Sequence, residues 1–199
     1  MNFRFDDEYN LQNDIVFLRP LVQDDIQYLL PFALTEPSLW NYSLKSAAGE
    51  DAMKKYVQDA INSRINEKEY TFIIFDKRTG LCGGSTRFYD IQPVADTVQL
   101  GFTWYGKDFQ GTGLNKHCKY LLLEFAFEKM EVYRVEFRAD HRNKRSIAAM
   151  KSIGCTEEGI LRSNGYCSDG SRRDSIVLSI LKKEWSDHVK ANLFNKLSY

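Results

Sequence analysis

The sequence has little that would hold a metal ion and no excess of charge of either sign. Its 199 residues include only three histidines and four cysteines, and no two cysteines form a Cys-x-x-Cys pair. Because this composition offers no recognisable metal motif, we expect no bound metal. Lysine plus arginine equal aspartate plus glutamate at 27 each. No overall field therefore attracts nucleic acid or an anionic membrane, and we expect neither as a partner.

Long apolar segments and a disulfide framework are missing as well. No apolar run approaches the roughly 20 residues that a membrane-spanning helix needs, and the opening MNFRFDDEYN is too acidic for a signal peptide. The dispersed cysteines are typical of reduced, mostly buried thiols. With 43% hydrophobic residues, the chain can fill one core. We predict one cytoplasmic domain over residues 1–199.

Helical and strand patterns alternate along the chain, and the periodicity of apolar residues gives their bounds. The predicted strands are 14–21, 70–76, 81–90, 97–106, 133–139, 155–162 and 172–181. The predicted helices are 23–34 with a kink or interruption at Pro31, 50–68, about 112–130, 143–154 and an amphipathic tail at about 182–197. Three successive strands from 70 to 106 indicate an antiparallel meander.

The predicted strand at 97–106 runs directly into a loop that contains glycine. Its apolar residues alternate, so Val98, Leu100, Phe102 and Trp104 should face one side of the sheet. This strand therefore ends where the next motif begins.

That loop and the start of the following helix read QGTGLNKHCKYLLL from Gln110. Two glycines keep side chains away from the first amides of the helix, which have no partner inside it. Unpaired amides and the positive end of the helix dipole favour a phosphate group, although a plain strand-to-helix turn is the alternative. The loop is not a Walker A motif, because Leu114 follows Gly113. Lys116 stands where a dinucleotide-binding fingerprint needs a third glycine.

The run GFTWYGKDFQGTGLNKHCKYLLLEFAFEKMEVYRVEFRADHRNKRSIAAMKSIGCTEEGILR resembles the central region of the GCN5-related N-acetyltransferase (GNAT) superfamily, above all its RimJ/RimL-like branch. The resemblance extends from LRPL near Arg19 to SILKKEW near Trp185. It implies an α/β (α+β) fold with a mixed, mostly antiparallel sheet of about seven strands, helices on both faces and a V-shaped splay beside the cofactor strand. It also implies a single acetyltransferase domain with a core at about 14–185 and acetyl-CoA as co-substrate.

In this family a loop of the form Gln/Arg-x-x-Gly-x-Gly/Ala wraps the pyrophosphate of acetyl-CoA, and pantetheine pairs with exposed backbone in the splay. Asn115 departs from the pattern, because Gly or Ala is usual there. Asn143 and Ser146 match the family's Asn-x-x-Ser pattern, although Asn143 could equally be a helix N-cap. The implied cofactor-binding residues are Phe102, Thr103, Trp104, Gln110, Gly111, Thr112, Gly113, Leu114, Asn115, Asn143 and Ser146.

The resemblance also implies a direct attack of an amine on the thioester, after which CoA leaves as a thiolate that needs a proton. Ser146 is the candidate acid, with an ordinary helix hydroxyl as the alternative. Glu136 is the candidate base acting through water, or else a satisfied partner of Arg134 or Arg138. The implied catalytic set is Ser146, Asn143 and Glu136.

Gln99 stands where relatives commonly carry a glutamate, and an amide cannot take up a proton. Near pH 7 about a tenth of α-amines with a pKa of roughly 7.7 to 8.0 are neutral, against well under ~0.1% of lysine amines with a pKa near 10.4. We therefore expect the α-amine of a peptide or protein N-terminus as acceptor. A small-molecule amine (polyamine, amino acid or amino sugar) and a non-catalytic acyl-CoA sensor are the alternatives.

The acceptor site should come mostly from the N-terminal half of the chain. We predict that Trp40, Tyr42, Arg87 and Gln99 contact the acceptor, with both aromatic residues exposed in the loop between the first two helices. In the alternative, Trp40 joins those two helices in the core. Asp140 and the following histidine are expected in a solvated loop. A homodimer through a sheet edge or the tail helix stays open.

Overall fold

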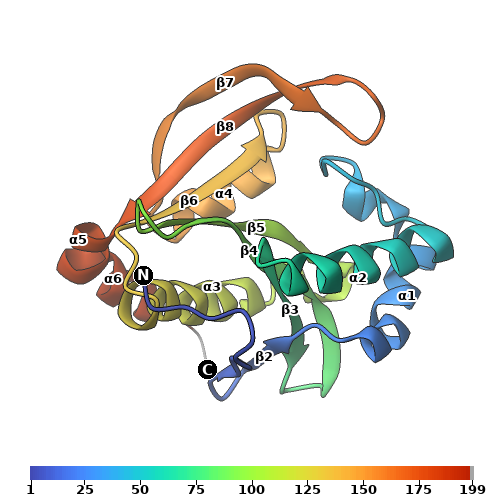
Figure 1. The fold of residues 1–199 in the computed structure, drawn as a ribbon, viewed down its shortest axis with the longest axis horizontal. Coiled ribbons are helices and arrows are strands. Elements are labelled where there is room, and N and C mark those ends of the chain that lie inside the picture. The colour runs from blue at the N-terminus through green and yellow to red at the C-terminus, as the bar shows by residue number, and fades with distance from the viewer. Residues whose placement is uncertain (198–199) are drawn as a thin grey trace.

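The computed structural model describes residues 1–197, and its centre is one eight-stranded sheet in the order β1-β2-β3-β4-β5-β6-β8-β7 (Figure 1). Every neighbouring pair is antiparallel except β5 and β6, which are parallel. The strands are β1 (Leu11–Gln12), β2 (Val16–Pro20), β3 (Glu69–Asp76), β4 (Leu81–Gln92), β5 (Thr97–Tyr105), β6 (Arg134–Asp140), β7 (Thr156–Tyr166) and β8 (Arg172–Leu181). The predicted mixed, mostly antiparallel sheet is confirmed. The additional strand is β1, whose two residues are too few to carry an alternating pattern.

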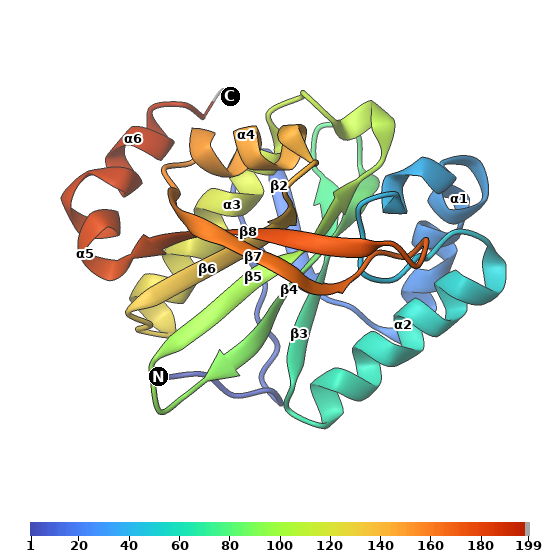
Figure 2. The same cartoon turned by 90° about the horizontal axis from the view of Figure 1, so that it is seen from above.

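Helices cover both faces of the sheet, as Figure 2 shows from above. The α-helices are α1 (Ile26–Thr35), α2 (Glu50–Ile65), α3 (Leu114–Glu124), α4 (Lys144–Ser152), α5 (Lys182–Glu184) and α6 (Lys190–Phe194). Short 3₁₀ turns are η1 (Gln23–Asp25), η2 (Pro37–Trp40) and η3 (Lys107–Phe109), and π-helical turns are η4 (Phe125–Lys129) and η5 (Trp185–Val189). Apolar side chains of α3 and α4 form one core and those of α1 and α2 the other.

Two helix predictions need correction. Helix α1 continues through Pro31 without interruption, and Thr35 Oγ1 donates a hydrogen bond to the Pro31 carbonyl at 2.8 Å. A proline this close to the start of a helix removes only one early backbone bond. The C-terminal helix is not one regular α-helix, because η5 separates α5 from α6 and α6 ends at Phe194. Residues 198 and 199 lie outside the described part of the chain.

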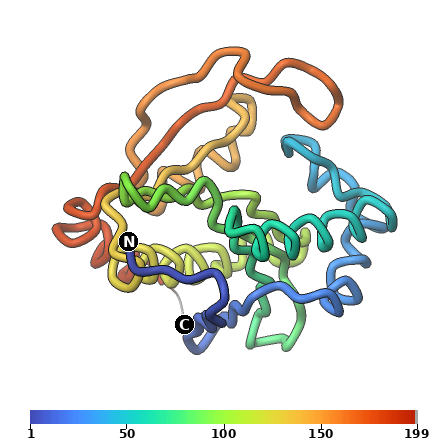
Figure 3. The backbone as a smooth tube through the Cα atoms, in the orientation of Figure 1, coloured from blue at the N-terminus to red at the C-terminus, as the bar shows by residue number. Residues whose placement is uncertain are grey.

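The N-terminal segment returns the start of the chain to the end of η4, which Figure 3 traces in blue. The Asn2 amide donates to the Met130 carbonyl at 2.8 Å, and the Met1 ammonium pairs with Asp96 at 2.6 Å. Within residues 1–197, no helix combines the length and the apolar character that crossing a membrane requires.

Strand β5 contains a β-bulge that changes the predicted alternation. Ser85 of β4 pairs with Trp104 and Arg87 pairs with Gly101, so one β4 residue lies opposite both Phe102 and its successor. Phe102 has a φ of 49°, in the left-handed region. The extra residue reverses the facing of the side chains that follow it. Val98 and Leu100 face the α3 side, but Trp104 packs in the core of α1 and α2, contrary to prediction.

Strands β5 and β6 separate soon after they meet. They pair only at Thr97 with Arg134, Val98 with Val135, and Gln99 with Glu136. Beyond this point β5 stays paired with β4, while β6 stays paired with β8 as far as Asp140. The two strands therefore diverge, and the predicted V-shaped splay is confirmed.

Candidate active site

The side chains of β5 beside the splay are already packed, so its backbone is what a ligand there could reach. The Phe102 ring lies edge-on to Tyr89 at 4.9 Å, and the Arg87 guanidinium lies 4.6 Å from its centroid. Trp104 is only 7% exposed and packs against Trp40, with ring centroids 5.5 Å apart. Backbone N–H and C=O groups that lack a strand partner can pair with an extended ligand.

The glycine loop at the start of α3 presents open amides. Gly111 and Gly113 have φ values of 80° and 88°, and nothing lies within 4 Å of where a Cβ would stand on either. Among residues 1–197, the amides of Gly111, Thr112 and Gly113 donate no hydrogen bond to the protein. Helix α3 begins at Leu114, whose side chain is fully buried. These unpaired amides at a helix start suit a pyrophosphate.

Two arginines that the sequence analysis missed lie against this loop. Arg78, from the turn between β3 and β4, donates from Nη1 to the Thr112 carbonyl at 3.3 Å. Arg145 of α4 donates from Nη1 to Gln110 Oε1 at 2.5 Å, and Gln110 Nε2 donates to the Tyr105 carbonyl at 2.7 Å. The half-buried Asn115 follows in the first turn of α3. Cations beside open amides strengthen the fit to a phosphate-bearing ligand.

The start of α4 holds the second polar motif. Asn143 is the N-cap of α4, because its Oδ1 accepts a hydrogen bond from the Ser146 amide at 3.0 Å. Ser146 is half-buried in the first turn. Arg145 lies between these residues in sequence and contacts Gln110, so the start of α4 and the glycine loop are joined.

Glu136 is held by two arginines of its own strand. Arg134 Nη2 donates to its Oε2 at 2.7 Å, and Arg138 Nε donates to its Oε1 at 2.7 Å. Both carboxylate oxygens therefore already accept a charged hydrogen bond. This is the satisfied arrangement that the sequence analysis set beside the role of a base.

Three of the four predicted acceptor residues are buried. Trp40 is 3% exposed, because η2 folds it onto the core of α1 and α2, so its predicted exposure is wrong. Arg87 is 6% exposed and pairs with Glu69 at 2.6 Å. Gln99 is 5% exposed and donates from Nε2 to Asp90 Oδ2 at 2.7 Å, while its Oε1 has no partner among residues 1–197.

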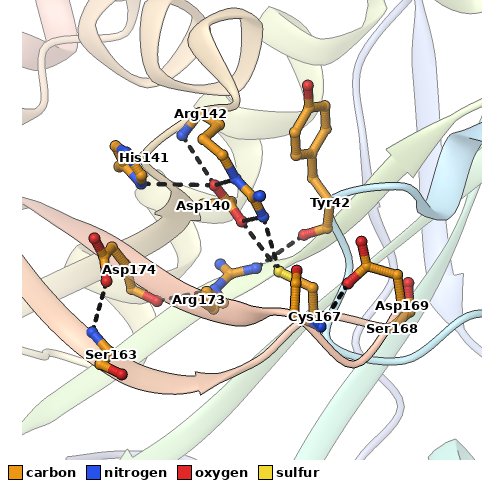
Figure 4. A network of polar contacts seen from close by, with 12 residues as sticks. Tyr42, Asp140, His141, Arg142, Ser163, Cys167, Ser168, Asp169, Arg173 and Asp174 are labelled. Carbon is orange, nitrogen blue, oxygen red and sulfur yellow. Dashed lines mark hydrogen bonds and ion pairs between the residues drawn. The ribbon is translucent and has the colours of Figure 1, made fainter.

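Asp140, at the end of β6, is the centre of a polar network rather than part of a solvated loop (Figure 4). It is 1% exposed, and Arg142 grips both of its oxygens, from Nε at 2.9 Å and from Nη2 at 2.7 Å. The Cys167 thiol donates to Asp140 Oδ2 at 3.2 Å. The hydrogen bonds from Arg142 hold the pKa of Asp140 far below its usual range. The prediction failed because Arg142 folds back onto the carboxylate and the β7–β8 connection covers it.

A cavity of about 350 Å³ lies beside this network. Its lining residues are Asn41, Tyr42, Arg142, Ser168 and Asp169. Tyr42 is 44% exposed. The loop that carries Tyr42 is tied to the β7–β8 connection, because Arg173 Nη1 donates to the Tyr42 carbonyl at 2.8 Å. The sequence gives no signal for this cavity, since its two walls are more than 120 residues apart.

Residues 16–156 match the family model described as the acetyltransferase (GNAT) domain. The chain belongs to the GNAT family. Within residues 1–197 of this GNAT protein, no three His, Cys, Asp or Glu side chains gather where a metal ion could bind.

Three similar proteins illustrate the relationship. YdaF of Bacillus subtilis (strain 168), provisionally named a ribosomal N-acetyltransferase, is 33% identical over 105 residues, which cover 53% of this chain and 56% of YdaF. This chain thus spans about half the length of that relative. The crystal structure of an acetyltransferase from T. thermophilus is 30% identical with a TM-score of 0.85, over 95% of this chain and 97% of that one. RimL, the ribosomal L7/L12 α-N-protein acetyltransferase, shares the fold at 18% identity and a TM-score of 0.78, over 87% of this chain and 94% of RimL. The resemblance to the RimJ/RimL-like branch is confirmed.

Proposed function

We propose that this protein transfers the acetyl group of acetyl-CoA to the α-amine of a peptide or protein N-terminus. The observation that carries the proposal is the combination of open loop amides and diverging strands on one side of the sheet. The loop from Gly111 to Gly113 offers phosphate-binding donors, and β5 leads from that loop to the splay. A chain that bound only a phosphate would have no use for the unpaired edge of β5.

The residues present fit acetyl-CoA in two places. The amides of Gly111, Thr112 and Gly113, with Arg78 and Arg145 beside them, would hold its pyrophosphate. The backbone of Phe102 to Trp104 would pair with its pantetheine. When bound, acetyl-CoA supplies an acyl group activated as a thioester.

The acceptor amine would have to arrive largely neutral. Gln99 cannot take a proton, and Glu136 would have to give up a hydrogen bond from Arg134 or Arg138 to accept one. The unpartnered Oε1 of Gln99 can accept a hydrogen bond from an amine N–H. Ser146, in the first turn of α4, is our candidate for returning a proton to the leaving sulfur. An amine with a pKa of roughly 7.7 to 8.0 suits such a site better than a lysine near 10.4.

The cavity bounded by Tyr42 and Arg142 supports an acceptor that extends beyond a single amine. It lies next in sequence to Asn143, the N-cap of α4, and it opens between two loops rather than inside the core. The names of YdaF and RimL, which concern ribosomal substrates, agree with a peptide acceptor.

A matched pair of peptides tests the proposal. One carries a free α-amine and no lysine, and the other has the same sequence with a blocked N-terminus and one lysine. We expect acetylation of the first to be at least about tenfold faster at pH 7.5, as measured by mass spectrometry, because far more of its amine is neutral. Faster acetylation of the lysine peptide would contradict the proposed acceptor, and turnover with small amines alone would reassign it.

A further inference from the structure

A lysine is buried directly beneath the splay. Lys119, on α3, is 5% exposed. Its Nζ donates to Thr103 Oγ1 of β5 at 2.8 Å and lies 5.8 Å from the ring centroid of Phe137 of β6. Phe137 follows the last residue of β6 that pairs with β5. The ammonium therefore lies between the two strands at the point where they part.

This ammonium has no acidic partner in the part of the chain that the structure describes. Within residues 1–197 no carboxylate lies within 4.0 Å of Lys119, and Thr103 accepts its one hydrogen bond. Burying a cation without a counter-ion is costly, and burial lowers the pKa of Lys119 to about 8. A methionine would fill similar volume without that cost. A group buried at such expense inside a cleft is a candidate for function.

The hydrogen bonds of Lys119 continue to the β5 bulge. Thr103 Oγ1 lies 2.7 Å from Thr86 Oγ1, and the Thr86 hydroxyl donates to the Gly101 carbonyl at 3.4 Å. Gly101 immediately precedes Phe102, whose φ of 49° is costly for a residue with a side chain. The chain of contacts thus runs from the buried cation to the strained backbone of the strand that borders the splay.

Protonation fixes the direction of this chain. An ammonium has three donors and no acceptor, so Thr103 must accept from Lys119 and its own proton is directed to Thr86. The Thr86 proton is then directed to the Gly101 carbonyl. A neutral amine has a lone pair and can accept from Thr103, which removes the constraint on the bulge.

We propose that Lys119 is a positioning residue whose ammonium, through Thr103 and Thr86, holds the β5 bulge in the conformation that receives acetyl-CoA. This inference rests on the proposed function for its ligand. Its chemical consequence is that the free protein pre-organises the splay only while Lys119 is protonated.

Other titratable groups around the ammonium do not change charge in the same pH range. The thiols of Cys118, beside it on α3, and Cys155, just before β7, each have a pKa that burial raises to about 12. Burial also raises the pKa of the Tyr105 hydroxyl well above its usual value. A change of acetyl-CoA affinity near pH 8 would therefore report on Lys119.

Calorimetric titration with acetyl-CoA, which has no free thiol, is the first test. We expect the Kd of the wild-type protein to rise about tenfold between pH 7 and pH 9.5, the size expected for losing one charge-assisted hydrogen bond. Lys119→Met and Thr103→Val should bind as weakly at pH 7 as the wild type does at pH 9.5, and Thr103→Ser should restore tight binding. Lys183→Met, on an exposed lysine, is the matched control. A wild-type affinity that is independent of pH, or a Lys119→Met protein that binds like the wild type, would overturn the proposal.

Hydrogen exchange of the free protein separates this inference from the proposed function. Amides 101–103 should exchange about tenfold faster at pH 7 in Lys119→Met than in Lys183→Met, because the bulge is no longer held. Equal exchange would overturn the inference even in a protein that acetylates peptides. Faster exchange in a protein that never binds acetyl-CoA would support the positioning role and refute the proposed ligand.

Discussion

Replacing Lys119 by methionine should stabilise the fold, by an amount that shrinks as the pH rises. Burial lowers the pKa of Lys119 from 10.5 to about 8. The protonated ammonium is thus about 3 kcal/mol less favourable in the folded protein than in the unfolded chain. Because the folded pKa is the lower one, the unfolded chain binds more protons between about pH 8 and 10.5, and wild-type stability rises with pH across this window.

Two terms set the expected size of the effect. The removed charge contributes about 3 kcal/mol at pH 7 and about 1 kcal/mol at pH 9.5. The lost hydrogen bond to Thr103 offsets about 1 kcal/mol at both pH values. Lys119→Met should therefore be about 2 kcal/mol more stable than the wild type at pH 7 and nearly equal to it at pH 9.5.

Urea unfolding under reducing conditions, followed by tryptophan fluorescence, measures both values. Lys183→Met, with a side chain 84% exposed, should match the wild type at each pH and serves as the control. A stability difference for Lys119→Met that is the same at pH 7 and pH 9.5 would refute the account of a buried, destabilising cation. A gain in stability together with weaker acetyl-CoA binding would show that function opposes stability at this residue.

Three further substitutions test the loop, the cap and the polar network. Gly113→Ala should cost about 1 kcal/mol and weaken acetyl-CoA binding, because a φ of 88° strains alanine although the space for its Cβ is open; unchanged thermal stability and Kd would contradict this. Asn143→Ala should lose about 1 kcal/mol of unfolding free energy while Asn143→Asp keeps it, since aspartate also caps α4; equal losses would remove the cap from the account. Asp140→Asn should lose about 2 kcal/mol at pH 7 through its broken ion pair. Because the pKa of Asp140 is depressed in the fold, the wild type's advantage should fade as the pH drops below about 4, and a loss that persists unchanged at acid pH would be inconsistent with that cause.

Local patterns predicted the parts of the site that depend on neighbouring residues. The two glycines before an apolar stripe predicted a helix start with open amides, and Gly111 and Gly113 have the left-handed conformations that glycine favours. The alternation of strand 97–106 was correct as far as Leu100 and failed at Trp104. A single bulged residue reverses every later side chain, and nothing in the residue types around Phe102 signals the bulge.

Contacts between distant segments could not be predicted in the same way. Lys119 belongs to an amphipathic helix in which a lysine would ordinarily face solvent, and only the packing of α3 beneath β5 and β6 buries it. Arg78 reaches the glycine loop from a hairpin turn 34 residues earlier. Asp140 seemed solvated because Arg142 and Cys167, which enclose it, come from a loop and a distant hairpin. Spacing along the chain carries no trace of these approaches.

The most direct test of the central claim is CoA release from acetyl-CoA with a peptide that has a free α-amine, followed by a thiol assay from pH 6 to pH 9. The account predicts turnover that rises as the amine loses its proton, with an apparent pKa of about 8. Tight acetyl-CoA binding without CoA release for any peptide, polyamine or amino sugar across that range would contradict it.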